Sequence, residues 1–532
     1  MAAKKTTNRL PKNRVEIYDT TLRDGSQAEG VSFSLEDKLT IAKKLDELGV
    51  DYIEGGYPLS NAKDEAFFKE IRKIKLKSSK IAAFGMTAKK GVKPEVDTCI
   101  QALYASKAPV VTLVGKGWDM QVTKVLNATL EQNLAMIADS VTYLKSKGRE
   151  VFVDIEHFFD GYKDNPVYSV KTLTAAAEAG ATRLILCDTN GGCMVSELRE
   201  IVEEVKSQID VPLGIHSHND CGLAVATSLA AVEVGAVQVQ GTINGFGERC
   251  GNADLCAIIP CLALKMGKKV LKPSSLKRLT EVSRFVYDQS NLNLPLNQPF
   301  VGHSSFAHKG GMHVHAVMKS SKCYEHIEPE MVGNTRRIII SELSGASNLL
   351  AKSEKLAMLE DKSLVRKILN EVQDLENQGY QFETADASFD ILVRKHTGTY
   401  QNFFKLLNYV TAVRRTSKNM YGTEAVVKLL VKGQKEHCVS EGDGPVDALD
   451  RAMRKALCPH FPVLKQVQLA DYRVRVVNSK DATAARVRVI IESNDKKTRW
   501  GTIGVSENII DASWKALVDS YEYKLLKDNI KP

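Results

Sequence analysis

Two histidines separated by a single residue, His216 and His218, are the clearest sign of chemistry in this sequence. They close a short apolar run, Leu213–His216, that is typical of a β-strand, and side chains two residues apart on a strand point to the same side. Two imidazoles that face the same way form half of a divalent-metal site. From these residues alone, a histidine pair that is only hydrogen-bonded to its neighbours is an equally good interpretation.

Arg23 and Asp24 follow the first strand candidate, Val15–Asp19. The Asp24 carboxylate can supply a hard oxygen ligand, and a mixed nitrogen and oxygen set suits a catalytic Lewis acid better than a structural zinc. A guanidinium beside such a metal can hold a carboxylate or polarise a carbonyl that becomes an alkoxide. The alternative for Arg23 is an ion pair at the surface with Glu54 or Glu156.

A glycine-rich turn, Gly245–Asn252, follows the last strand candidate of the first half of the chain. In barrels, the turn after the eighth strand is a usual place for ligand contacts. The spacing of its glycines fits neither the dinucleotide-binding nor the P-loop pattern. The turn therefore predicts a ligand contact but no nucleotide-phosphate cradle.

These residues lie far apart in the sequence, so a scaffold must bring them together. The first half of the chain repeats a short β-branched run, a polar turn and an amphipathic segment such as Leu35–Leu48 or Leu130–Lys145, the first with a plausible cap at Ser34. The strand candidates are Val15–Asp19, Tyr52–Glu54, Ile81–Phe84, Val110–Val114, Val151–Ile155, Arg183–Cys187, Leu213–His216 and Val237–Gly241. Eight such units over about 250 residues predict a (β/α)8 TIM barrel, with a doubly wound open sheet as the alternative.

The carboxyl ends of these strands carry most of the polar and ionisable side chains, and barrel enzymes place their chemistry there. In chain order the ends offer Arg23 with Asp24, Glu54, Thr112, Glu156, Asp188 with Thr189, His216 with His218, and the segment Asn244–Asn252. In a closed barrel the first and seventh strands are two places apart, so Asp24 can reach a metal held by the histidines. The convergence predicts one site.

After the barrel pattern ends, the predicted secondary structure changes twice along the chain. We predict a flexible leader over residues 1–14, a catalytic barrel over 15–265, a mostly helical subdomain over 266–385 and an α+β domain over 386–532. The sequence predicts that the last domain consists of two similar halves. The expected strands are Phe389–Val393, Val426–Val431 and Glu436–Val439 before a helix from Pro445, then Val467–Val477, Val487–Ile491 and Thr502–Val505 before a helix from Asn508.

Composition excludes several classes of protein. The chain has 532 residues, 43% hydrophobic and 26% charged, as in soluble proteins of two or three domains. No apolar stretch is long enough for a membrane span, and the basic start lacks the apolar core of a signal peptide, although a transit peptide is conceivable. The net charge of +9 is spread along the chain without the basic stripe of nucleic-acid-binding proteins. The ten scattered cysteines favour reduced thiols, so we expect a cytoplasmic protein that binds neither nucleic acid nor membrane.

Three segments carry a resemblance to a known family. Asp19–Gln27, His216–Asp220 and Gly245–Asn252 resemble the three signatures of the 2-isopropylmalate, homocitrate and citramalate synthase group, and the likeness extends from about Val15 to Leu525. Within the group, the sequence is most similar to the long citramalate synthases. The segments that carry this finer likeness are Ile53–Pro58, Glu156–Tyr162, His308–His313 and Ala512–Leu517. One departure is Ser26, where many members have Glu; it lies beside the expected ligands and weakens the subgroup assignment more than the chemistry.

The resemblance implies a metal-dependent acyltransferase that condenses acetyl-CoA with pyruvate to give citramalate and CoA, a step of isoleucine biosynthesis. It implies Asp24, His216 and His218 as ligands of a divalent metal, with Asn252 as a fourth or outer ligand. The donor set does not distinguish zinc, manganese, cobalt and magnesium. A 2-isopropylmalate synthase with a larger pocket, a homocitrate synthase, a carbon–carbon lyase and an inactive metabolite sensor are the alternatives.

The same likeness assigns roles to further residues. Arg23 would stabilise the developing oxyanion, and Thr189 would bind the carboxylate of the 2-oxo acid. Glu156 would form an acid–base pair with His313, which the family delivers from the partner subunit together with Tyr324, so a homodimer or larger assembly is expected. The C-terminal part resembles a regulatory domain, which implies isoleucine, or else leucine, as an effector; the predicted helix starts near Gly444-Pro445 and Ser506–Asn508 could seat its carboxylate. A dimerisation domain without a ligand is the alternative.

Overall fold

The computed structural model describes residues 11, 13–340, 348–349, 361–415, 421–477 and 485–532. Contacts divide the chain into two compact units, Met1–Phe306 with Ile327–Thr335, and Ala307–His326 with Arg336–Pro532. Each unit has its own hydrophobic core. The expected flexible leader, residues 1–14, falls almost entirely outside the described residues.

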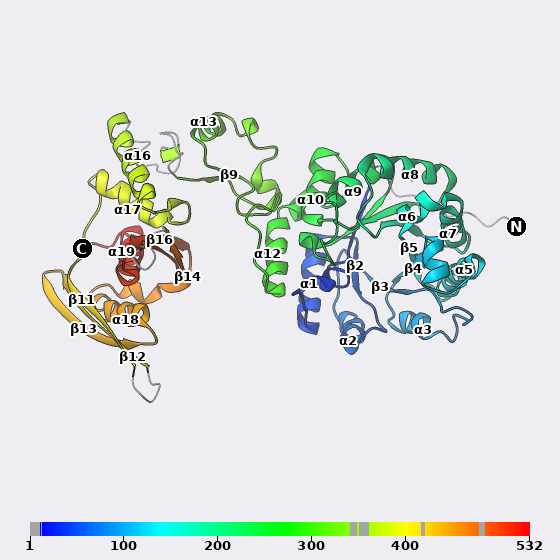
Figure 1. Ribbon diagram of the computed structural model, residues 1–532, viewed down its shortest axis with the longest axis horizontal. Helices are drawn as coiled ribbons and strands as arrows, with labels where there is room; N and C mark the ends of the chain where they lie inside the picture. Colours follow the sequence, from blue (N-terminus) through cyan, green and yellow to red (C-terminus); the bar gives the residue numbers. More distant parts are fainter. Residues whose placement is uncertain (1–10, 12, 341–347, 350–360, 416–420, 478–484) are drawn as a thin grey trace. The chain divides into compact units, whose positions relative to one another are not determined.

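The first unit is a closed barrel of eight parallel strands, surrounded by helices (Figure 1). The strands are β1 (Glu16–Asp19), β2 (Tyr52–Gly56), β3 (Lys80–Met86), β4 (Val110–Lys116), β5 (Glu150–Glu156), β6 (Arg183–Asp188), β7 (Leu213–Ser217) and β8 (Gln238–Gly241). β8 pairs with β1 in parallel, from Gln238 opposite Glu16 to Gly241 opposite Asp19. This pairing closes the barrel, so the predicted barrel is confirmed and the open sheet is excluded.

Helices follow the strands on the outside of the barrel and continue after it. They are α1 (Leu35–Leu48), α2 (Ala62–Ile71), α3 (Thr98–Ala105), α4 (Asp119–Lys124), α5 (Leu130–Ser146), α6 (Phe158–Asp164), α7 (Pro166–Glu178), α8 (Val195–Gln208), α9 (Ala224–Glu233), α10 (Leu255–Pro260), α11 (Pro273–Leu276) and α12 (Leu279–Ser290). In the described residues no helix is both long and apolar enough to cross a membrane.

Local capping explains where α1 starts and ends. The Ser34 hydroxyl accepts a hydrogen bond from the Asp37 amide at 3.1 Å, and the Asp37 carboxylate accepts one from the Ser34 amide at 2.8 Å. This reciprocal pair satisfies two amide groups that the first turn would leave unbonded. Gly49 ends the helix at φ 93°, a left-handed conformation that glycine adopts without a steric penalty. The cap predicted at Ser34 is confirmed.

Large side chains fill the interior of the barrel. Tyr18, Tyr52 and Phe152 lie together inside it, and the Tyr52 and Phe152 rings meet edge to face with centroids 5.0 Å apart. An interior packed in this way is a core rather than a channel. Polar groups at the carboxyl ends of the strands therefore rest on a layer of large side chains that limits their movement.

In its described residues, the second unit contains a helical part with one two-stranded sheet, followed by two three-stranded sheets. Its first elements are β9 (Ala307–His308), which pairs in parallel with β10 (Arg337–Ile338), and the helices α13 (Gly311–Lys319), α16 (Lys362–Asn377) and α17 (Asp386–His396). Then come two three-stranded antiparallel sheets, each followed by a helix. They are β11 (Phe404–Arg415), β12 (Tyr421–Val431) and β13 (Gln434–Gly442) before α18 (Pro445–Leu457), and β14 (Gln468–Val476), β15 (Val487–Asn494) and β16 (Arg499–Ser506) before α19 (Ile509–Lys527).

The two predicted halves are therefore present, with one error in the first. The expected strand Phe389–Val393 is part of helix α17, which has Asp386 in its first turn and Arg394, Lys395 and His396 in its last, a charge pattern that favours a helix. A short apolar run cannot be assigned to strand or helix by periodicity alone. The true first strand, β11, was missed because a register shift between Leu406 and Asn408 interrupts the alternation of its side chains.

Candidate active site and metal centre

Asp24, His216 and His218 form a buried group that could hold a metal ion. One candidate ligand atom from each lies within 4.8 Å of the others. Asp24 comes from the turn after β1, and the histidines come from the end of β7, with β8 between these strands. His216 Nε2 lies 3.2 Å from Asp24 Oδ2. The predicted meeting of the first and seventh strand ends is confirmed, as is the shared direction of the two imidazoles.

Asn252 joins this group through the glycine-rich turn. Its side-chain amide donates to Asp24 Oδ2 at 2.8 Å, and its backbone pairs with that of His218. The turn folds this tightly because a Cβ at Gly247 would lie 2.3 Å from Asn252 Oδ1 and one at Gly251 would lie 2.1 Å from the Gly245 carbonyl oxygen. Glycine is therefore required at both positions for Asn252 to reach the carboxylate of Asp24.

The protonation states of Asp24 and His218 suit a cation. Burial raises the pKa of Asp24, but the charge of Arg23 and the hydrogen bond from His216 outweigh burial, and the pKa of Asp24 is held well below its usual range. Burial and the charge of His216 lower the pKa of His218 to about 4. At neutral pH the group therefore offers a carboxylate and at least one neutral imidazole, which are the forms that bind metals.

Two atoms of the group lack hydrogen-bond partners. His218 Nδ1 and Asn252 Oδ1 are buried, and no described residue bonds to them. A buried polar atom without a partner is costly and calls for an explanation such as an ion or a water molecule. A divalent cation with bound water would satisfy these atoms, so the residues present fit a metal site.

Further polar side chains orient the ring of His216 through its Nδ1 atom. Its Nδ1 lies 2.9 Å from Gln240 Oε1, and Gln240 Nε2 donates to Asp154 Oδ1 at 3.0 Å. Burial raises the pKa of Asp154 to about 7, although the charge of His216 opposes this rise. A hydrogen bond on one imidazole nitrogen fixes the tautomer and leaves the other nitrogen as the ligand atom. This chain of contacts directs His216 Nε2 toward Asp24.

Three neighbouring side chains hold Arg23 in place. Its Nε donates to Glu54 Oε2 at 2.5 Å, its Nη1 lies 3.4 Å from Asp24 Oδ2, and its guanidinium stacks on Phe84 at 3.7 Å from the ring centroid. Glu54 in turn accepts a hydrogen bond from Tyr18 at 2.8 Å. The pair with Glu54, which the sequence left as an alternative, thus exists in the barrel interior rather than at the surface. It leaves the Nη atoms of Arg23 beside the metal group.

Thr189 and Glu156 lie at the neighbouring strand ends. The Thr189 hydroxyl accepts a hydrogen bond from the His157 amide at 2.8 Å, so its own hydrogen is left to donate to a ligand. His157 adopts φ 52°, a left-handed conformation that is costly for a residue other than glycine. Glu156 ends β5 and forms an ion pair with Lys116 at the end of β4.

His313 and Tyr324 belong to the second unit. Their rings stack with centroids 4.1 Å apart and an interplanar angle of 23°. His313 lies on α13, and both side chains are exposed within their own unit. The predicted pairing of His313 with Glu156 joins residues of different units and stays a prediction.

Sequence reasoning missed Gln240, Asp154, Lys116 and Phe84. A signal for two of them existed: Asp154 is two residues before Glu156 on β5, and Gln240 alternates with Val239 on β8, which places both polar side chains inside the barrel. Polar residues at inward positions of a buried strand are candidates for contacts with metal ligands.

Family models match most of the chain in three consecutive segments. The HMGL-like family matches residues 14–286, the homocitrate synthase post-HMGL domain-like family matches residues 300–380, and the LeuA allosteric (dimerisation) domain matches residues 383–525. The first match covers the barrel with Asp24, His216, His218 and Asn252. The last covers the two-sheet domain.

Relatives are similar over nearly the whole length. The (R)-citramalate synthase of Geobacter sulfurreducens is 53% identical over 96% of this chain and 98% of its own, and that of Aquifex aeolicus is 51% identical over 97% and 98%. The probable 2-isopropylmalate synthase of Methanopyrus kandleri is 33% identical over 95% and 97%. These matches agree with the resemblance carried by the three sequence signatures, and the chain belongs to the (R)-citramalate synthase family.

Proposed function

We propose that this chain condenses acetyl-CoA with pyruvate and hydrolyses the thioester, releasing (R)-citramalate and CoA. The observation that carries the proposal is the 53% identity to an (R)-citramalate synthase over 96% of the chain. The 2-isopropylmalate synthase relatives are more distant, at 33% and 30%. The metal-competent group at the barrel mouth and the adjacent Arg23 support the same class of reaction.

The metal group would hold the acceptor. Asp24, His216 and His218 would be the ligands, with Asn252 as a fourth or outer ligand. A bound divalent cation supplies Lewis acidity toward the ketone and carboxylate oxygens of a 2-oxo acid. Zinc, manganese, cobalt and magnesium all accept such a donor set, and titration of the metal-free protein with each ion, read as restored turnover, would identify the native metal.

Arg23 would stabilise the ketone oxygen of pyruvate, and Thr189 would bind its carboxylate. The contacts with Glu54 and Phe84 hold the guanidinium in place, so its Nη donors are positioned before charge develops on the ketone oxygen. Donors positioned in advance lower the barrier because they need no reorganisation during the reaction. The Thr189 hydroxyl would donate to the carboxylate.

The carbon–carbon bond requires removal of a proton from the methyl group of acetyl-CoA. We assign this step to the pair of Glu156 and the partner subunit's His313, with the partner's Tyr324 stacked on that imidazole. The proton passes to the base, the methyl carbon attacks C2 of pyruvate, and the ketone oxygen takes the electron pair and is then protonated. Water attacks the thioester carbonyl, and CoA leaves as the thiol. Hydrolysis makes the condensation irreversible.

A thiol-release assay with four acceptors tests the substrate. Pyruvate, 2-oxobutyrate, 2-oxoisovalerate and 2-oxoglutarate should be compared by kcat/KM. We expect pyruvate to exceed 2-oxoisovalerate by about 100-fold or more, because a pocket that fits a methyl group must exclude an isopropyl group by steric clash. Equal or better use of 2-oxoisovalerate would identify a 2-isopropylmalate synthase instead.

The two-sheet domain supports a dimer and an amino-acid effector. Its match to the LeuA allosteric (dimerisation) domain indicates both roles in general terms. Val410 and Val413 on β11 and Val474 and Val476 on β14 are between 43% and 60% exposed. Exposed apolar side chains on these two sheets are candidates for burial by a second copy. We propose a homodimer that isoleucine inhibits, with leucine as the rival effector.

Calorimetry on the full-length protein with isoleucine, leucine and valine tests the effector. Isoleucine should bind and inhibit thiol release, while valine should do so more weakly. Absence of binding by all three at millimolar concentration would leave the domain with dimerisation alone.

A further inference from the structure

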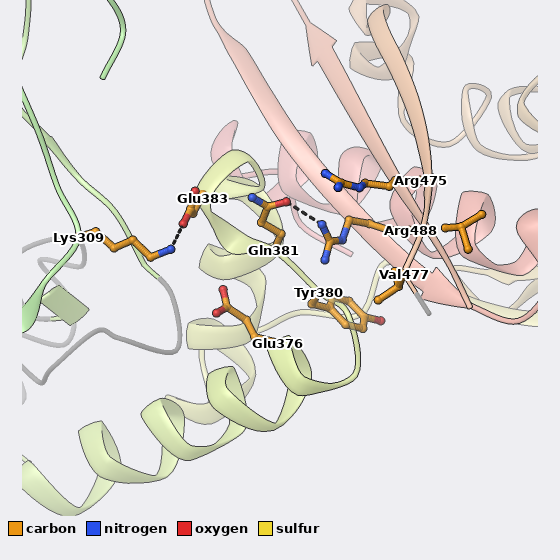
Figure 2. A pocket seen from close by; sticks show the side chains of 9 residues that line it. Lys309, Glu376, Tyr380, Gln381, Glu383, Arg475, Val477 and Arg488 are labelled. Carbon is orange, nitrogen blue, oxygen red and sulfur yellow. Dashed lines mark hydrogen bonds and ion pairs between the residues drawn. The ribbon is translucent and has the colours of Figure 1, made fainter. Parts of the chain in front are cut away.

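The second unit contains a polar pocket of about 440 Å³ that the proposed reaction does not use (Figure 2). The end of α16 and the following turn form one wall through Glu376, Tyr380 and Gln381. Strands β14 and β15 form the opposite wall through Arg475 and Arg488. Figure 2 shows both guanidinium groups directed from the sheet toward this space.

The two arginines are direct cross-strand partners. Arg475 on β14 stands opposite Arg488 on β15 in the antiparallel register. Like charges in this arrangement are destabilising, because their side chains lie within about 5 Å of one another at Cβ. Burial and then the neighbouring charge of Arg475 lower the pKa of Arg488. The fold therefore holds an unfavourable pair of cations at the wall of a pocket.

Among the residues that the structure describes, the other charged groups that line the pocket do not fully neutralise this pair. Lys309 forms an ion pair with Glu383, so these two charges cancel. Glu376 offsets part of the charge of Arg488 and also accepts a long hydrogen bond, 3.5 Å, from the Phe382 amide. The charged side chains in the described lining, three basic and two acidic, therefore leave one positive charge in excess.

The two guanidinium groups differ in their contacts. Arg488 donates from Nε to the Gly379 carbonyl oxygen and from Nη1 to Gln381 Oε1 at 2.7 Å, which fixes its plane. The side chain of Arg475 makes no hydrogen bond or ion pair with any residue that the structure describes. One arginine is thus held in place, and the other keeps all five of its donors for a ligand.

We propose that Arg475 and Arg488 bind a phosphate group in this pocket. Planar guanidinium forks donate pairs of parallel hydrogen bonds to phosphate oxygens, and a dianion would offset two adjacent cations. The pocket is larger than a phosphate ion, so the group can be free inorganic phosphate or part of a phosphorylated metabolite. The residues that line this pocket differ from Asp24, His216 and His218, and the proposal does not depend on the proposed reaction.

Isothermal calorimetry on the full-length protein in chloride buffer tests the proposal, with inorganic phosphate, ribose 5-phosphate and malonate as probes. We expect a phosphate probe to bind at millimolar concentration or better. Arg475→Gln should weaken that binding about tenfold or more, since a hydrogen bond between charged groups is lost. The matched control is Arg473→Gln on the same strand, because Arg473 already pairs with Asp471 at 2.6 Å and does not line the pocket.

The outcomes separate the sources of the phosphate. Tighter binding of ribose 5-phosphate than of inorganic phosphate supports a phosphorylated metabolite, and equal or weaker binding supports the free ion. The proposal is overturned if neither phosphate probe binds, if Arg475→Gln and Arg473→Gln reduce affinity equally, or if malonate binds as tightly as phosphate.

Discussion

Each end of the barrel holds a buried pair of arginine and glutamate, and the two pairs differ in their surroundings. At the amino ends of the strands, Arg183 donates from Nε and Nη2 to the two oxygens of Glu16 at 2.9 and 3.0 Å. At the carboxyl ends, Arg23 donates from a single nitrogen to Glu54 and also lies beside Asp24. One guanidinium thus meets one carboxylate at the first end and two at the second.

The comparison shows that buried charge alone does not identify a functional site. The Arg183–Glu16 pair is closed, because the fork of the arginine matches both carboxylate oxygens. At the other end, Asp24 is an additional anion next to two imidazoles, and His218 Nδ1 has no partner among the described residues. A divalent cation would bind to these acceptor atoms, which lack enough donors of their own. The Arg183–Glu16 pair should therefore contribute to stability, and the group of Asp24, His216 and His218 should contribute to catalysis.

The largest effect on turnover is expected at the carboxyl ends of the strands, where Asp24 and His216 lie. Asp24→Asn and His216→Ala should each lose the metal and lower turnover by about 10³-fold or more, because polarisation of the ketone is lost. Metal analysis and thiol release measure these losses, and circular dichroism verifies the fold. Glu16→Gln, which changes a carboxylate at the amino ends of the strands, is the control and should keep its metal. Full metal occupancy in both Asp24→Asn and His216→Ala would refute the assignment of these residues as metal ligands.

Arg23→Lys should lower kcat by about 10²- to 10³-fold with the metal retained. A lysine has no planar fork, so it cannot keep its contact with Glu54 and also donate to the ketone oxygen. Steady-state kinetics and metal analysis on the same sample measure the two effects. An unchanged kcat would assign Arg23 to stability, like Arg183.

Gln240→Ala should weaken metal binding about 10- to 100-fold, because His216 loses the hydrogen bond that orients its ring. Competition with a chelator measures the affinity. Gln238→Ala is a matched control two residues earlier on β8, since Gln238 Nε2 bonds to Glu16 at 3.1 Å and not to a metal ligand. Equal losses in the two variants would contradict a specific role for Gln240.

Arg183→Met should have the smallest effect on turnover and a large one on stability. It leaves Glu16 buried without its cation, which costs about 3–5 kcal/mol, whereas a combined Glu16→Met and Arg183→Met variant should recover much of this loss. Denaturant unfolding measures the midpoints, and thiol release per folded molecule should stay near the parent value. A double variant as unstable as the single one, or a loss of metal, would break the contrast between the two ends.

Patterns of local sequence were sufficient for most of the fold. The barrel strands were predictable because each unit repeats the same apolar period and turn residues, and α1 was predictable from Ser34 and Asp37. The two errors in the two-sheet domain have different causes: a register shift between Leu406 and Asn408 interrupts the pattern of β11, whereas the run Phe389–Val393 was ambiguous. A short apolar run is compatible with both element types, and contacts with the rest of the domain decide between them.

The sequence by itself determined the residue types of the candidate site and their strand ends, because the period of two on β7 and the closure of a (β/α)8 barrel bring Asp24, His216 and His218 to one place. Only the tertiary structure decided which neighbours those residues have. Glu54 rather than Glu156 pairs with Arg23, and Gln240 joins His216 to Asp154. These contacts join segments 24 to 86 residues apart and depend on distances within the closed barrel, which no local pattern of residues encodes.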